Sequence, residues 1–174
     1  IDAESGEELT FGELKIRVDA LAADFASKGL QRRGVVLHRP NSPAWFVSYL
    51  SLRQAGAVVI PLDSTNSSER VSAVARAFGA AWIFDESGLC PVAGASRHWQ
   101  AGLALIKLTS GTSGEPKGLP FTDTEMLADA ANITATMGFG SHDRNLALHP
   151  LGHSYALGNV VYPLYSHGVS CVIG

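Results

Sequence analysis

Apolar residues recur at helical spacing near the start of the chain, over residues 10–28. Thr10 and Glu13 stand three residues apart at the head of this run, a spacing typical of a capping box at a helix N-terminus. Gly29 follows the run and is a favourable C-terminal stop. The apolar positions that share one face of the predicted helix are Phe11, Leu14, Val18, Leu21 and Phe25.

Strand and helix patterns then alternate along the chain. Short, continuous apolar runs predict strands at 35–38, 57–61, 80–84, 103–108, 145–149 and 169–173. Amphipathic runs predict helices at 43–55, 66–78, 122–137 and 154–165, and residues 85–102 are predicted to form a loop. The sequence therefore predicts an α/β fold. Its sheet is open and mostly parallel, with right-handed crossovers and helices on both faces, as a three-layer sandwich.

Two of these helices carry start signals of their own. Asn66 with Glu69, and Thr122 with Glu125, have the three-residue spacing of a capping box. The helix predicted at 43–55 carries three aromatic side chains at helical spacing, which we expect in the core. They are Trp45, Phe46 and Tyr49.

Composition and charge narrow the class of protein. The chain has 174 residues, 46% hydrophobic and 17% charged, which is typical of one globular domain, here with up to two lobes. Its net charge is −3 and no Lys/Arg stripe is present, which argues against a nucleic-acid partner. No apolar run approaches the ~18 residues of a membrane span, and residues 1–8 are too polar for a signal peptide. Cys90 and Cys171 are far apart, which predicts a reducing, cytoplasmic setting with both thiols inert or buried.

The stretch LTSGTSGEPKG, Leu108–Gly118, is the strongest candidate for chemistry. It follows a predicted strand and precedes a capped helix, the kind of turn that binds phosphate in α/β proteins. Gly111, Gly114 and Gly118 permit unusual turns and a close approach of backbone N–H groups to an anion. Lys117 adds a mobile positive charge. Neither the Walker pattern nor G-x-G-x-x-G fits, so the residues alone leave both a phosphate loop and a structural turn open.

The same stretch resembles, at every position, the signature loop of the AMP-forming adenylating enzymes. This superfamily includes acyl-CoA synthetases, nonribosomal-peptide adenylation domains and firefly luciferase. Three further segments resemble motifs of the family in the same order: LTFGEL (Leu9–Leu14), LRQAGAVVIPLDS (Leu52–Ser64) and LHPLGHSYALG (Leu148–Gly158). The chain departs from the family pattern at Arg33-Gly34, where Gly-Asp is usual, and in a shorter stretch between Ser64 and Leu108.

The resemblance implies that residues 1–174 are an incomplete N-terminal ATP- and acyl-binding domain. Its predicted lobes are 30–121, which carries the phosphate loop, and 1–29 together with 122–174. The chain begins with Ile and stops directly after a predicted strand, so we expect later family elements to lie downstream. These are an aromatic-Gly-x-Thr-Glu segment, a ribose-binding aspartate and a mobile C-terminal domain.

The resemblance also implies a reaction and its residues. A carboxylic acid reacts with ATP, accompanied by Mg²⁺, to give an acyl-adenylate and pyrophosphate, and CoA or a carrier-protein thiol then accepts the acyl group. Lys117 takes the catalytic role, His153 lies near the acyl pocket and the adenylate, and no metal ligand is assigned. We expect the isolated chain to be inactive and to self-associate through incomplete edges. The residues implied in binding the ATP phosphates are Thr109, Ser110, Gly111, Thr112, Ser113, Gly114, Lys117 and Gly118.

Several alternatives remain open at this point. Ser154 stands in a segment close to G-x-S-x-G and could serve a serine hydrolase or acyltransferase, although a helix N-cap is the favoured interpretation. A non-catalytic nucleotide-binding or interaction module is the other class. His149 and His153 are spaced like helical metal ligands, but Pro150 between them argues against a continuous helix. Asp123 is interpreted as first-turn support for the helix dipole.

Overall fold

A six-stranded mixed sheet forms the centre of the computed structural model, which describes residues 1–95, 97–109 and 116–174. The strand order is β4-β3-β1-β2-β5-β6. The four inner strands are parallel, and each outer strand is antiparallel to its neighbour. The predicted open, mostly parallel sheet is thus confirmed. The strands are β1 (Gly34–His38), β2 (Val58–Leu62), β3 (Trp82–Asp85), β4 (Gly88–Pro91), β5 (Leu103–Thr109) and β6 (Lys117–Thr122).

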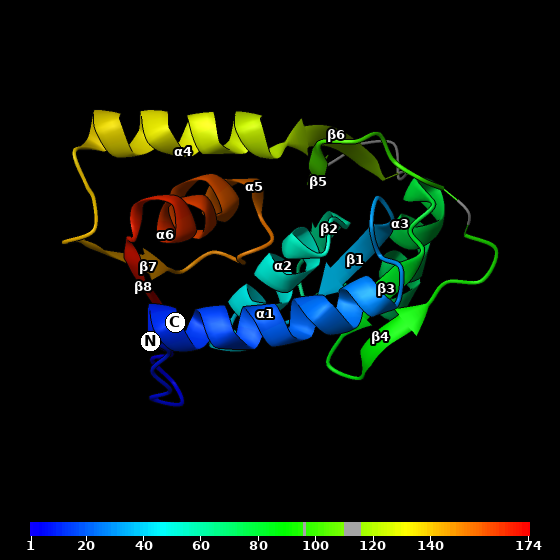
Figure 1. Ribbon diagram of the computed structural model, residues 1–174, viewed down its shortest axis with the longest axis horizontal. Helices are drawn as coiled ribbons and strands as arrows, with labels where there is room; N and C mark the ends of the chain where they lie inside the picture. Colours follow the sequence, from blue (N-terminus) through cyan, green and yellow to red (C-terminus); the bar gives the residue numbers. More distant parts are fainter. Residues whose placement is uncertain (96, 110–115) are drawn as a thin grey trace.

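Helices cover both faces of this sheet, as Figure 1 shows. Helices α1 (Phe11–Ser27) and α2 (Pro43–Gln54) pack together on one face, and α3 (Ser68–Phe78) packs on the other. Successive β1 residues point to opposite faces, so Val35 joins the core on the α1 and α2 side and Val36 joins the core beneath α3. The predicted three-layer arrangement is therefore confirmed, with one apolar core on each side of the sheet.

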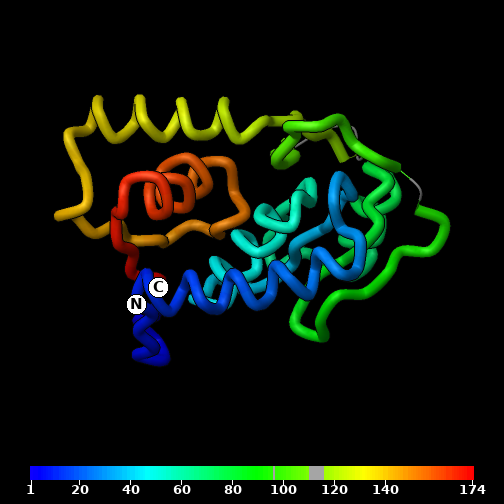
Figure 2. The backbone as a smooth tube through the Cα atoms, viewed as in Figure 1, coloured from blue at the N-terminus to red at the C-terminus, as the bar shows by residue number. Residues whose placement is uncertain are grey.

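The remaining elements form a second, smaller layer of structure. Strands β7 (Arg144–Ala147) and β8 (Ser170–Ile173) make a two-stranded parallel sheet. Figure 2 shows this sheet beside the first residues of the chain, where Asp2 forms a bridge with Ile173. The helices of this part are α4 (Asp123–Met137), α5 (Ser154–Ala156), the π-helix η1 (Leu157–Val161) and α6 (Tyr162–His167).

Local capping explains where the helices begin. The Thr10 hydroxyl accepts a hydrogen bond from the Glu13 N–H, and the Glu13 carboxylate accepts one from the Thr10 N–H at 2.9 Å. Thr122 and Glu125 form the same reciprocal pair at the start of α4, so both predicted capping boxes are confirmed. The predicted box at Asn66 is wrong. The neighbouring residue caps α3 instead, because the Ser67 hydroxyl accepts from the Arg70 N–H.

Two further predictions about the elements need correction, and the prediction of an aromatic core cluster is confirmed. Residues 85–102 are not wholly a loop, because β4 pairs with β3 along a short hairpin. The helix predicted at 154–165 is divided into α5, η1 and α6. The aromatic cluster is confirmed as core, since Trp45 and Tyr49 are almost fully buried and their rings stack 5.2 Å apart. Cys171 is buried, whereas Cys90 is exposed.

No helix of the described residues is long and apolar enough to cross a membrane.

Candidate functional site

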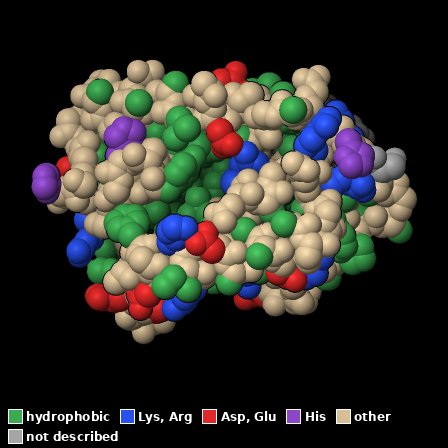
Figure 3. Space-filling model, viewed as in Figure 1, with side chains coloured by type: hydrophobic (Ala, Val, Ile, Leu, Met, Phe, Trp, Pro, Cys, Tyr) green, Lys and Arg blue, Asp and Glu red, His purple; other side chains and the backbone are tan. Residues whose placement is uncertain are grey.

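An apolar hollow on the surface lies away from the predicted site residues. Figure 3 shows hydrophobic side chains gathered in a hollow between α1 and the helices above it. This hollow of about 330 Å³ is lined mainly by Phe11, Leu14, Val18, Leu164 and Tyr165, and no predicted site residue lines it. The predicted site residues therefore lie elsewhere in the fold.

The carboxyl ends of the parallel strands meet at one edge of the large sheet. Strands β1, β2, β3 and β5 end there at His38, Leu62, Asp85 and Thr109. Ligands of open α/β sheets bind at this edge, because the loops that leave it are free to vary around a rigid scaffold. The stretch Leu108–Gly118 leaves this edge from the end of β5, so the fold puts the motif where a ligand site is expected.

The stretch connects two strands rather than a strand and a helix. Thr109 pairs with Lys117 at the loop end of the β5–β6 hairpin, and the Thr109 hydroxyl donates to the Lys117 carbonyl at 3.4 Å. The predicted strand-to-helix turn is wrong, because six residues of β6 separate the loop from α4. The dipole of α4 therefore does not point at the loop. Predicted phosphate ligands that lie outside the described residues are Ser110, Gly111, Thr112, Ser113 and Gly114.

The described end of the loop gives Lys117 and Gly118 different roles. Lys117 is exposed at the start of β6, so its ammonium group is free to meet a ligand from solvent. Gly118 does not have the left-handed backbone expected of a turn glycine. A Cβ atom at Gly118 would lie 2.5 Å from the Ile106 side chain and 2.9 Å from the Phe78 ring. Gly118 is thus required by close packing of β6 against α3, which corrects its predicted role in a turn.

A second lysine, Lys107, lies on the same hairpin, and the sequence pattern did not predict it as a site residue. The Lys107 Nζ lies 4.5 Å from the centroid of the Phe121 ring, and burial lowers the pKa of its ammonium group. Asp129 opposes that shift through its charge. Lys107 is therefore a half-buried cation held by an aromatic face, and its position inside an apolar strand is the signal that marks it.

His153 also comes to the carboxyl edge. The loop before it is tied to the turn after β1, because the Leu151 N–H donates to Asn41 Oδ1 at 2.8 Å and Asn41 Nδ2 donates to the His149 carbonyl at 3.0 Å. Gly152 packs tightly beside Pro61 of β2. The His153 ring is exposed, and its Nδ1 accepts from the Tyr155 N–H at 3.3 Å. Its predicted role near an acyl group stays a prediction.

The geometry of this segment supports neither Ser154 as a nucleophile nor His149 and His153 as metal ligands. The N-cap of α5 is His153 and not Ser154, which corrects the favoured interpretation of Ser154. A turn rather than a strand precedes Ser154, and within the described ranges no hydrogen bond joins its hydroxyl to a histidine. A nucleophile would need both features. The rings of His149 and His153 lie 6.5 Å apart, and the described part of the chain holds no group of three potential metal ligands.

A hollow of about 290 Å³ lies at the carboxyl ends of β1 and β3. The chain runs from β1 to β2 on one side and returns to β3 on the other, so the hollow sits at the point where the strand order reverses. Its lining includes His38, Ser64, Asp85, Glu86 and Ser87. The Asp85 and Glu86 carboxylates accept hydrogen bonds from hydroxyl or amino groups, and their negative charge disfavours phosphate in this hollow.

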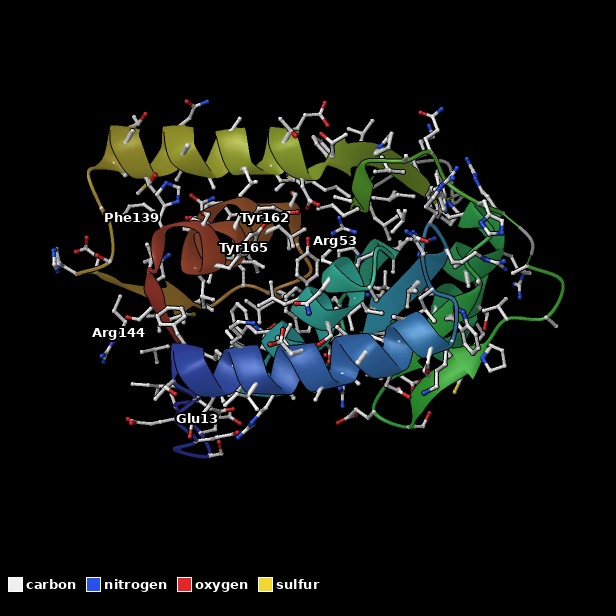
Figure 4. All side chains as sticks on the ribbon, in the orientation of Figure 1. Glu13, Arg53, Phe139, Arg144, Tyr162 and Tyr165 are labelled. Atoms are coloured by element: carbon white, nitrogen blue, oxygen red, sulfur yellow. The ribbon has the colours of Figure 1, made fainter. Side chains whose placement is uncertain are left out.

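A partly buried polar network joins helix α2 to the second layer. Arg53 of α2 donates to Asp123 Oδ2 at 2.5 Å, and the Tyr162 hydroxyl donates to Asp123 Oδ1 at 3.2 Å. The Tyr49 hydroxyl donates to the Tyr162 hydroxyl at 3.1 Å. Figure 4 shows Arg53 close to Tyr162 and Tyr165 of α6. Burial raises the pKa of all three tyrosines, so they stay neutral.

Asp123 thus does more than support the dipole of α4, because it also anchors the far end of β6. Sequence spacing gives no signal of this network, since its members are up to 113 residues apart.

Comparison with known proteins places these motifs in a family. The chain is 34% identical over 163 residues to 2-succinylbenzoate–CoA ligase of Escherichia coli, covering 84% of this chain and 36% of that protein. It is 29% identical over 198 residues to equisetin synthetase of Fusarium heterosporum, covering 97% of this chain and 5% of that protein. The chain therefore spans much less than half the length of either relative.

The fold has a close structural counterpart. The N-terminal subdomain of Klebsiella oxytoca NpsA, in complex with 3-hydroxyanthranilyl-AMSN, superposes with a TM-score of 0.82 at 21% identity. The match covers 100% of this chain and 48% of that one. The model of the family described as AMP-binding enzyme matches residues 1–102 and 95–174, which together cover the whole chain. The chain belongs to this family of AMP-binding, adenylate-forming enzymes.

Proposed function

We propose that the protein containing this chain activates a carboxylic acid with ATP and then transfers the acyl group to CoA. The observation that carries this proposal is the position of Leu108–Gly118, which leaves the carboxyl end of β5 and returns with Lys117 exposed on β6. Membership of the AMP-binding family and likeness to a CoA ligase support it. Carrier-protein thiols are the other acceptor that the family allows.

The proposed first step is an in-line displacement at phosphorus. A carboxylate oxygen forms a bond to the α-phosphorus of ATP, while the bond from that phosphorus to the bridging oxygen breaks. The electron pair of this bond leaves with pyrophosphate. Catalysis of this kind depends on positioning and on stabilising the charge of the leaving group.

Lys117 is suited to the charge of the β- and γ-phosphates, because its ammonium group is exposed beside the loop. Thr109 adds a hydroxyl at the other end of the loop. His153 is proposed to lie near the acyl group. Magnesium would accompany ATP and would offset part of the negative charge of its phosphates. The described residues present donors for phosphate rather than a set of metal ligands, so we derive no step through the metal.

Carboxylate-dependent exchange of pyrophosphate into ATP tests the first step. We expect exchange by a protein that includes this chain together with the further length of its relatives, screened against a panel of aliphatic and aromatic acids. Lys117→Ala should lower the exchange rate about 100-fold or more, because it removes charge stabilisation of the leaving group. Lys15→Ala is the matched control, since Lys15 is exposed on α1 and paired with Asp19. Equal exchange rates in wild type and Lys117→Ala would contradict the assignment.

Three further measurements separate the parts of the proposal. The 174-residue chain alone is expected to show no exchange, and carboxylate-dependent exchange by it would refute that expectation. CoA-dependent release of AMP in the longer protein distinguishes CoA from a carrier-protein thiol. Binding of ATP without any exchange, across the acid panel, would favour a non-catalytic nucleotide-binding module.

A further inference from the structure

A cluster of cationic and N–H donor groups lies at the opposite edge of the large sheet, where its parallel strands begin. Arg32 and Arg33 precede β1, and Arg33 forms an antiparallel bridge with His98. The Trp99 N–H donates to the Arg32 carbonyl at 2.8 Å, and Arg32 Nε donates to the Trp99 carbonyl at 2.8 Å. Two segments about 65 residues apart in sequence thus present their basic side chains together. In Figure 3, blue and purple side chains gather at the end of the molecule opposite the small sheet.

The side chains of this cluster are held in place but keep free donors. The Arg97 guanidinium lies 3.5 Å from the centroid of the Trp99 ring, which orients its plane and leaves its N–H edges open. Arg33 donates to the Ala95 carbonyl at 2.8 Å and lies 3.2 Å from His98 Nε2. Because arginine only donates, that histidine nitrogen accepts, and the other ring nitrogen carries a hydrogen.

The charge of the cluster is not balanced by acidic side chains. Among the residues that the structure describes, no salt bridge includes Arg32, Arg33 or Arg97. Below the exposed groups, Arg33 Nε and Trp99 Nε1 are buried and have no acceptor among the described residues. Trp99 Nε1 packs against the backbone at Gly34, so it faces the interior and not the surface. A chain with a net charge of −3 thus concentrates exposed positive charge at one place.

We propose that the exposed side chains of Arg32, Arg97 and His98 form a binding site for an oxyanion of the phosphate class. A phosphate group offers several acceptor oxygens and pairs with the forked donors of guanidinium groups. The site is separate from the Leu108–Gly118 loop. It lies where the strands begin, about 16 Å along the sheet from the edge where they end. The proposal does not depend on the proposed adenylation, because it uses none of the same residues.

A titration followed through the indole N–H groups tests this site directly. The chain has three tryptophans, and Trp99→Phe assigns the Trp99 signal in a two-dimensional NMR spectrum of ¹⁵N-labelled protein. Inorganic phosphate is added at constant ionic strength, with chloride as the reference anion. We expect a saturable shift of the Trp99 indole signal with phosphate and none with chloride.

Substitutions then locate the bound anion. Arg97→Ala and Arg32→Ala should each weaken binding about ten-fold or more, because each removes a charge-assisted hydrogen-bond donor. Arg17→Ala is the matched control, since Arg17 is an exposed arginine already paired with Glu7. Folding of each variant is verified from the dispersion of its amide signals.

Three outcomes would overturn the proposal. The first is no Trp99 shift with phosphate, and the second is the same shift with chloride. The third is a shift that Lys117→Ala abolishes while Arg97→Ala leaves it unchanged, because the anion would then bind at the loop. Retention of the shift in Arg17→Ala and Lys117→Ala, with its loss in Arg97→Ala, supports the site.

Discussion

Replacing Asp123 by Asn tests the ion pair that joins α2 to the start of α4. Asn keeps the shape of the side chain and can still accept a hydrogen bond from Tyr162, but it removes the charge that faces Arg53. The Arg53 side chain is only 13% exposed, whereas that of Asp123 is 47% exposed. The pair is therefore intermediate between a surface salt bridge and a buried one.

The expected cost follows from that intermediate exposure. Surface pairs contribute about 0–1 kcal/mol, and removal of one partner from a fully buried pair costs about 3–5 kcal/mol. Because Asp123 remains half in solvent, we expect the free energy of unfolding to fall by about 1–2 kcal/mol. In a chain of this size that change lowers Tm by about 2–8 °C.

Urea unfolding at neutral pH provides the measurement, and a double-mutant cycle isolates the pair. Arg53→Met keeps the apolar stem of the side chain and removes its charge. The coupling between Arg53→Met and Asp123→Asn should be about 1 kcal/mol. Asp24→Asn is the control, because Asp24 pairs with Lys28 at an exposed position of α1 and should cost about 0.5 kcal/mol or less. A coupling within about 0.3 kcal/mol of zero would refute the view that this pair ties the two layers together.

Three other predictions follow from single positions. Gly118→Ala should destabilise the protein by about 1–3 kcal/mol in urea unfolding, because its Cβ has no room, whereas Gly140→Ala, which meets open space, should not. Hydrogen bonds from the backbone and hydroxyl of the cap residue lower the pKa of the Glu125 carboxyl, so its contribution to stability is complete above about pH 4.5 and is lost as pH falls through the folded pKa. The stability difference between Glu125→Gln and wild type should therefore shrink below that pH in acid unfolding. Burial raises the pKa of the Cys171 thiol to about 11, so iodoacetamide at pH 8 should modify exposed Cys90 well before Cys171, and equal rates would contradict the buried environment.

Much of the architecture is readable from the sequence because its signals are local. The capping boxes of α1 and α4 each lie within four residues, and the inner strands are uninterrupted apolar runs. The sequence pattern predicts the N-cap of α3 at Asn66, one residue before the true cap at Ser67. Both residues are good caps, and only the folded backbone decides between them.

The elements that the sequence pattern missed have two different causes. Strands β4 and β6 contain Gly and Pro, which hide them from propensity, yet an edge strand tolerates both. The error over β6 made a hairpin loop look like a turn into a helix. The network of Arg53, Asp123 and Tyr162 has no sequence signal for a different reason, since it unites three elements far apart in the chain. The loop motif itself was readable only as a resemblance.

The prolines of the two outer strands have a consequence for solubility. Pro120 lies within β6, and Pro91 closes β4, so each free edge of the sheet contains a residue without an N–H group. A proline in an edge strand turns its nitrogen away from the paired neighbour, toward the side where another strand would add. Each edge therefore offers an interrupted row of donors to a strand from a second molecule. Fibre-like growth of the sheet by strand addition is hindered at both ends.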